Sequence, residues 1–166
     1  MIDDAGEDVE PGDEGEIIAR GPKQFLGYQD SSADTGCFFE GTWFRTGDLG
    51  RLDGDGYLIV TDRVKDVIIR GGENISAREV EEVLARHPAV LEAAACAAPD
   101  EVWGEVVCVF VVAQPGRTAP SLSALQEHGR HEGLAAHKLP ARVRVVASLP
   151  RTAAGKVRKR DLRQLL

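Results

Sequence analysis

The sequence predicts an α+β protein in two pieces, a small antiparallel β unit followed by a compact domain in which helices cover a small sheet. Three observations support this prediction. Glycine and proline divide residues 1–60 into segments that are too short for helices but long enough for strands. After Thr61, apolar runs typical of strands alternate with helical periodicities. The charge also differs, because residues 1–60 carry 4 basic and 14 acidic side chains, whereas residues 61–166 carry 16 and 13.

The first piece is expected to contain strands and no helices. Its candidate strands are residues 16–20, 43–45, 49–52 and 57–61. Between the last two strands lies Asp53-Gly54-Asp55-Gly56. This is a strong hairpin signal, because Asp and Gly accept the positive φ angles of tight turns.

The second piece begins with a strand and a helix. Residues 67–69 are expected to form a short apolar strand that ends at Gly71-Gly72. Ser76 and Glu79 then have the S-x-x-E spacing of a capping box, in which the serine side chain accepts a hydrogen bond from the first turn of the helix. Apolar residues recur at helical spacing behind that box until His87-Pro88 stops the helix.

Three further strands and two helices complete the second piece. The strands are expected over residues 90–98, 106–113 and 143–146, and the last helix over residues 160–166. The other helix is expected to start at Ser121, although Gly129 weakens it by about 1 kcal/mol relative to alanine. The order strand, helix, strand, strand, helix, strand, helix is typical of a compact α+β domain.

Composition excludes several classes of protein. The formal net charge is −7, so nucleic acid is not an expected partner. No apolar run approaches the roughly 20 residues of a membrane-spanning helix, so no integral membrane segment is expected. The first residues lack the basic and apolar regions of a signal peptide, which predicts a cytoplasmic location. The 3 cysteines show no C-x-x-C spacing, so we expect neither a disulfide framework nor a protein-bound metal site.

Four short segments are rich in polar residues and glycine where strands and helices do not require them. They cover residues 44–48, 62–66, 70–74 and 150–156. The last contains Gly155-Lys156 but is not a phosphate-binding P-loop, because Pro150 stands where that loop needs glycine and Val157 where it needs Ser or Thr. What remains is a lysine on a loop, which is either a solvated side chain or a positive charge for an anionic group.

Together, these segments resemble the adenylate-forming superfamily, which includes AMP-forming acyl- and aryl-CoA synthetases, peptide-synthetase adenylation domains and firefly luciferase. The resemblance extends from Gly15 to Leu166. It is carried by the strings WFRTGD (43–48), DR and KD (62–63 and 65–66), RGGENIS (70–76), EVE (79–81), PDE and WGE (99–101 and 103–105), and LPRT with GK (149–152 and 155–156). In that family an acid and ATP give an acyl-adenylate and pyrophosphate, and the thiol of coenzyme A then displaces AMP.

The resemblance implies roles for particular residues. Asp48 matches the aspartate that holds the ribose hydroxyls, and Arg63 matches a second ribose or phosphate contact. Lys65 matches the hinge about which the small C-terminal domain rotates between the two half-reactions. Lys156 matches the lysine that reaches the carboxylate and the α-phosphate during adenylation. Gly71-Gly72 matches the loop used for thioester formation, where absent side chains let pantetheine approach the backbone.

The same resemblance implies the domain organisation. Residues 1–62 correspond to the terminal β sub-barrel of a large N-terminal adenylation domain, and residues 63–166 to the mobile C-terminal domain, with its hinge near residue 65. The phosphate loop, acyl pocket and adenine-binding segment of the large domain have no counterpart in these residues. The chain is therefore expected to be inactive alone and to act with that missing domain on a carboxylic acid, magnesium-bound ATP and coenzyme A.

Two functions from different classes remain open. One is the C-terminal part of an ATP-dependent acid–thiol ligase for a fatty, alicyclic or aromatic acid, which residues 68–79 and 133–140 favour over a peptide-synthetase domain. The other is a non-catalytic module that binds a partner or carrier protein through its basic end. From Lys138 to Arg163 there are nine basic residues and one acidic residue, which suits either a solvated surface or contact with coenzyme A phosphates.

Overall fold

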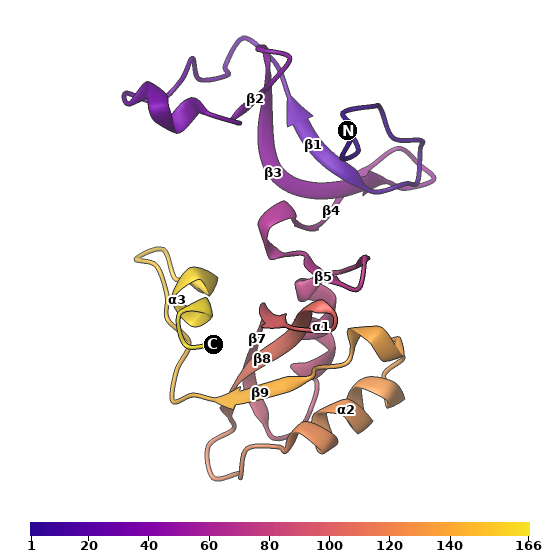
Figure 1. Ribbon diagram of the computed structural model, residues 1–166, viewed down its shortest axis with the longest axis vertical. Helices are drawn as coiled ribbons and strands as arrows, with labels where there is room; N and C mark the ends of the chain where they lie inside the picture. Colours follow the sequence, from indigo (N-terminus) through magenta and orange to yellow (C-terminus); the bar gives the residue numbers. More distant parts are fainter. The chain divides into compact units, whose positions relative to one another are not determined.

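The computed structural model describes residues 1–166, apart from the side chain of Ala33. The chain divides into two compact units, Met1–Lys65 and Asp66–Leu166. The first unit contains an antiparallel sheet and a short 3₁₀ helix, and the second combines a sheet with three α-helices (Figure 1). The α+β class predicted from the sequence is confirmed.

The first unit is a curved four-stranded antiparallel sheet (Figure 1). Its elements are β1 (Gly15–Ala19), the 3₁₀ helix η1 (Ser31–Asp34), β2 (Phe38–Phe39), β3 (Trp43–Leu52) and β4 (Leu58–Arg63). The long strand β3 pairs with each of the other three strands. The strand β3 therefore holds the sheet of this unit together.

The structure joins residues 43–45 and 49–52, which were expected as two strands, into the single strand β3. Gly47 lies between them with a φ of +70°, a value that glycine adopts without steric cost, so the strand continues through it. The expected hairpin is confirmed after β3. Its turn is closed by the Asp53 carboxylate, which accepts from the backbone N–H groups of Asp55 at 3.0 Å and Tyr57 at 2.9 Å.

The second unit has a five-stranded sheet with helices on both faces. Its strands are β5 (Ile68–Arg70), β6 (Glu73–Ile75), β7 (Val90–Asp100), β8 (Gly104–Ala113) and β9 (Arg142–Val145). Its helices are α1 (Ala77–Leu84), α2 (Leu122–His131) and α3 (Lys159–Arg163), with a 3₁₀ turn η3 (Ala136–Lys138). The strand order is β6-β5-β8-β7, and β9 runs parallel to β8.

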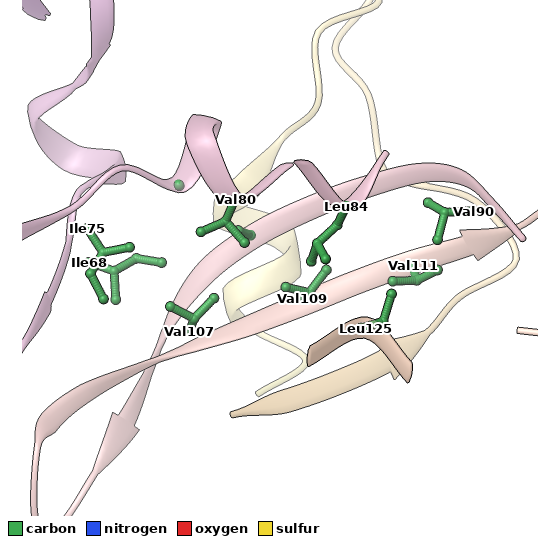
Figure 2. Close-up of a cluster of buried hydrophobic side chains, with 11 residues drawn as sticks. Ile68, Ile75, Val80, Leu84, Val90, Val107, Val109, Val111 and Leu125 are labelled. Atoms are coloured by element: carbon green, nitrogen blue, oxygen red, sulfur yellow. The ribbon is translucent and has the colours of Figure 1, made fainter. Parts of the chain in front are cut away.

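The strand β8 is apolar from Val106 to Ala113 because both of its faces are buried there. Val107, Val109 and Val111 belong to the cluster that packs under α1 and α2, as Figure 2 shows. The intervening residues, among them Cys108 and Phe110, pack on the other face with Leu162 of α3. A strand covered on both faces loses the alternation of apolar and polar residues, which explains the continuous apolar run in the sequence.

The two longer helices begin where the sequence predicts. Ser76 Oγ accepts from Glu79 N at 3.1 Å, and Ser121 Oγ accepts from Ala124 N at 3.2 Å, so each serine caps its helix. Gly129 is buried within α2, and a Cβ atom there would lie 2.9 Å from Leu139 Cδ2. The glycine that weakens the helix therefore gives the following segment room to pack closely.

Candidate functional site

Asp48 and Arg63 lie directly opposite each other in the first unit. They are register partners on β3 and β4, and Arg63 Nε donates to Asp48 Oδ1 at 2.8 Å. Both side chains remain open to solvent, with exposed fractions of 32% for Asp48 and 50% for Arg63. The structure thus brings together the two residues to which the resemblance assigns nucleotide contacts.

The segment that leads to Asp48 is held by groups that the sequence did not reveal. Glu16 on β1 is buried, forms an ion pair with Arg45 at 2.7 Å and accepts from Gly47 N at 3.2 Å. Thr46 Oγ1 donates to the carbonyl of Ile17 at 2.6 Å and accepts from Asp48 N at 3.1 Å. These contacts fix the backbone on both sides of Gly47 and therefore the direction of the Asp48 carboxylate.

An open cavity of about 370 Å³ lies beside Arg63. Arg45, Arg63 and Lys65 contribute cationic side chains to its lining, and Thr46 contributes a hydroxyl group. The remaining lining residues are Glu16, Thr35, Gly36, Cys37, Gly47 and Val64. The cations and the hydroxyl group suit a polar, anionic molecule or part of one. Lys65 is exposed and lies in the 3₁₀ turn η2 (Val64–Asp66), where the first unit ends.

Gly71 and Gly72 form the turn between β5 and β6 in the second unit. Their φ angles are +59° and +89°, which side chains disfavour. Gly71 N donates to the carbonyl of Trp103 at 2.8 Å, and a Cβ atom on Gly71 would lie 2.8 Å from the Trp103 ring. The guanidinium of Arg70 covers the same ring at 5.3 Å from its centroid. Gly71 is therefore required by both its conformation and its contact.

The loop that presents Trp103 is organised by Asp100. Its Oδ1 atom accepts from the backbone N–H groups of Val102 and Trp103, both at 3.1 Å. These bonds lower the pKa of the Asp100 carboxyl group, since they favour its ionised form. Glu105, from the same sequence string, accepts from Ile69 N at 2.8 Å and thereby joins β8 to β5.

Lys156 lies at the end of a tight turn over residues 152–156. Gly155 has a φ of +81°, and Thr152 N donates to the carbonyl of Lys156 at 2.8 Å. The side chain of Lys156 is exposed. Among the described residues, none forms a hydrogen bond or an ion pair with its ammonium group. By contrast, Lys138 and Lys159 are bound to Glu79 at 2.7 Å and Glu81 at 2.8 Å. Lys156 thus has an available charge on an ordered turn.

The predicted site residues fall into two groups. Asp48, Arg63 and Lys65 belong to the first unit, and Gly71-Gly72 and Lys156 to the second. Within the second unit, no described hydrogen bond connects the Gly71-Gly72 turn with the turn that carries Lys156.

Two further features bear on the class of protein. Among the residues whose side chains are described, no group of three or more His, Cys, Asp or Glu is placed to hold a metal ion. No helix in the described chain has the length and apolar character needed to cross a bilayer.

The comparisons with known proteins identify the family. Residues 79–156 match the family model of the AMP-binding enzyme C-terminal domain. The chain is 46% identical over 167 residues to an indoleacetate–CoA ligase of Aromatoleum aromaticum, covering 100% of this chain and 32% of that protein. It is 44% identical over 165 residues to a 2,3-dihydroxybenzoate-AMP ligase of Bacillus subtilis, covering 99% and 30%.

A solved structure agrees with these relatives. The fold resembles that of ATP-bound MatB from Rhodopseudomonas palustris with a TM-score of 0.89 and 33% identity, covering 99% of this chain and 32% of that one. The resemblance in the sequence is therefore confirmed. Residues 79–156 match the AMP-binding enzyme C-terminal domain, and the chain as a whole matches the C-terminal part of adenylate-forming enzymes. It spans about a third of the length of these relatives.

Proposed function

We propose that this chain supplies the C-terminal part of an ATP-dependent acid–thiol ligase. In the first half-reaction, a carboxylate oxygen of the acid attacks the α-phosphorus of ATP, and the bond to the β-phosphate oxygen breaks with release of pyrophosphate. In the second, the thiol sulfur of coenzyme A attacks the acyl carbon, the bond to the AMP oxygen breaks, and the thiol proton passes to solvent. The products are acyl-CoA, AMP and pyrophosphate.

The available ammonium group of Lys156 is the observation that carries this proposal. During the first half-reaction, negative charge accumulates on the oxygens around the α-phosphorus. A positive charge held in advance at that position stabilises the transition state more than the ground state. Lys156 is exposed on an ordered turn, whereas Lys138 and Lys159 are occupied by carboxylates. It is therefore the lysine of this region that we assign to the α-phosphate.

Asp48 and Arg63 are assigned to the nucleotide. A ribose hydroxyl group donates to a carboxylate, which Asp48 offers on the surface of β3. Arg63 uses Nε for Asp48 and has further N–H groups that suit a hydroxyl or phosphate oxygen. Their mutual ion pair orients both side chains before ATP binds. The magnesium ion arrives bound to the triphosphate of ATP.

Gly71-Gly72 and Lys65 are assigned to the second half-reaction. The turn at Gly71-Gly72 has an exposed backbone without Cβ atoms, and an extended pantetheine chain requires such an approach. Lys65 is the last residue of the first unit, so a rotation about its backbone changes the position of the second unit. A fatty, alicyclic or aromatic acid is the proposed substrate, with support from the relatives named for indoleacetate and 2,3-dihydroxybenzoate.

The substitution Lys156→Ala in the complete enzyme tests this proposal. We expect the rate of adenylation to fall by at least about 100-fold, because a charge that stabilises the transition state is lost. Release of pyrophosphate measures this rate. Thioester formation from a supplied acyl-adenylate should be spared. Lys23→Ala, which removes an exposed lysine from the first unit, serves as the control. An equal fall in both half-reactions would assign Lys156 to folding instead.

A further inference from the structure

The turn that carries Lys156 is a narrow hairpin with few anchors of its own. Arg151 and Val157 form an antiparallel bridge at its base, and Gly155 N donates to the carbonyl of Thr152 at 2.9 Å. Lys156 N donates to Thr152 Oγ1 at 3.2 Å. Val157 at the base packs against the buried cluster that contains Cys108 and Phe110, whereas residues 151–156 are all exposed. The exposed part of the turn, which includes Lys156, therefore depends on polar contacts.

Arg151 makes two of these contacts with one guanidinium group. Its Nη1 atom donates to the carbonyl of Gly155 at 2.7 Å, and its Nη2 atom forms a short ion pair with Glu92. Gly155 directly precedes Lys156, whereas Glu92 lies in β7 and pairs with Val112 of β8. The planar guanidinium group thus connects the tip of the turn to the body of the sheet.

This ion pair is poorly placed to stabilise the fold as a whole. The exposed fractions of the side chains are 45% for Arg151 and 34% for Glu92, and exposed pairs of this kind contribute little to the free energy of unfolding. Its geometric effect is larger, because it joins this turn to β7, a strand that pairs along its length with the buried strand β8. A misplacement of about 1 Å at a reacting centre can lower the rate by about 100-fold.

We propose that Arg151 and Glu92 are positioning residues for Lys156 in the adenylation half-reaction. This inference rests on the function proposed for Lys156. Arg151 holds the Gly155 carbonyl, and Glu92 holds Arg151, so the backbone that presents the ammonium group is fixed before the acid and ATP arrive. Neither residue needs to touch a substrate.

The complete enzyme carrying Arg151→Ala, Arg151→Lys or Glu92→Gln tests the inference. With Arg151→Ala we expect the kcat of adenylation to fall by about 10-fold or more, with the KM for ATP little changed, because the misplacement affects the transition state rather than binding. Arg151→Lys keeps a positive charge for the ion pair but cannot hold Glu92 and the Gly155 carbonyl with one planar group. Its kcat of adenylation should lie between those of the original enzyme and Arg151→Ala. Glu92→Gln should reproduce part of the loss, and thioester formation from supplied acyl-adenylate should be unchanged in all three variants.

Arg86→Ala is the matched control, because Arg86 forms a comparable surface ion pair with Glu132 at 3.2 Å elsewhere in the second unit. It should leave both half-reactions unaltered. A fall in thioester formation equal to that in adenylation, or an unfolding midpoint lowered only by the Arg151 variants, would show a merely structural role and overturn the inference.

A second comparison separates this inference from the function on which it rests. In an enzyme that already carries Lys156→Ala, Arg151→Ala should cause no further loss of adenylation, since there is no charge left to position. An undiminished 10-fold loss in that background would overturn the positioning role alone. If Lys156→Ala by itself left adenylation intact, the proposed function of Lys156 would fail, and the role of Arg151 with it.

Discussion

Gly71 is constrained twice, by its backbone conformation and by the Trp103 ring. Gly72 beside it has a positive φ as well, but no atom lies within 4 Å of the place where its Cβ would be. Alanine in a left-handed conformation costs roughly 1–2 kcal/mol at either position. The collision with a ring should add about 1 kcal/mol or more at Gly71.

We therefore expect Gly71→Ala to lower the free energy of unfolding by more than Gly72→Ala does. Urea denaturation of the chain with both variants measures the difference. Equal destabilisation would mean that the Trp103 ring moves away without cost, and that Gly71 is required only for its φ.

Site residues are predictable from sequence where neighbours along the chain share a function. Asp48, Arg63 and Lys156, the residues that we propose for the site, each lie in a short polar string, and the resemblance of those strings to a known family made them candidates. Arg151 lies in such a string as well, but its contacts with the Gly155 carbonyl and with Glu92, like those of Glu16 with Gly47, exist only after folding. A buried carboxylate on β1 leaves no signal in a strand pattern, because one polar residue among apolar ones reads as the exposed face.

The 3₁₀ turn η2 is the element that should act as the hinge. Proline in place of Lys65 fixes φ near −65° and removes one N–H donor, and it restricts the conformation of Val64. We expect Lys65→Pro in the complete enzyme to retain adenylation and to lose coenzyme A transfer. Lys65→Ala should be much milder, since it removes the charge and leaves the torsion free. Single-turnover measurements of each half-reaction decide this, and equal loss of both steps with proline would count against a backbone hinge.

The junction of α1 and α2 contains a pair of histidines that should make stability depend on pH. The rings of His87 and His128 lie 5.1 Å apart, and His87 Nδ1 accepts from Ala89 N at 3.1 Å. Burial lowers the pKa of His87 below its usual value of 6.5, and the nearby charges of His128 and Arg117 lower it further. The unfolded chain therefore binds a proton at a higher pH than the folded chain does.

The stabilising effect of neutral His87 is thus present above about pH 6.5 and is lost as the pH falls through the lowered pKa. His87→Asn keeps an acceptor for the N–H group two residues on but removes the titration. We expect the free energy of unfolding to fall less steeply with acid in this variant than in the original chain. Chemical denaturation at several pH values gives both slopes, and identical slopes would contradict the role of His87.

Elements were predictable in proportion to their length and burial. Strand β8 and the starts of α1 and α2 follow from apolar runs and capping serines. The strands β2 and β6 have two and three residues, too few to show a period of two. Helix α3 ends at Arg163, whereas the sequence predicts a helix over residues 160–166. The prediction rested on three leucines, and only Leu162 is a buried residue of the helix.

The chain as a whole should not activate an acid. Lys156 supplies one charge to a reaction whose other phosphate contacts we assign to a part of the enzyme outside these residues, and losing even one such donor can cost about 3 kcal/mol. Exchange of labelled pyrophosphate into ATP, measured with a panel of fatty and aromatic acids, should remain at background. Clear exchange that depends on the acid would show a complete active site within these residues and would contradict the proposed function.

The ion pair between Asp66 and Arg163 joins the two ends of the second unit. Arg163 on the last helix donates to the carboxylate of Asp66, the first residue of the unit, at 2.8 Å across 97 positions of sequence. This ion pair therefore brings the first residue of the unit and its last helix together. An exchange of the chain at Lys65–Asp66 should therefore keep the second unit folded, because both buried clusters of its sheet are made of residues within the unit.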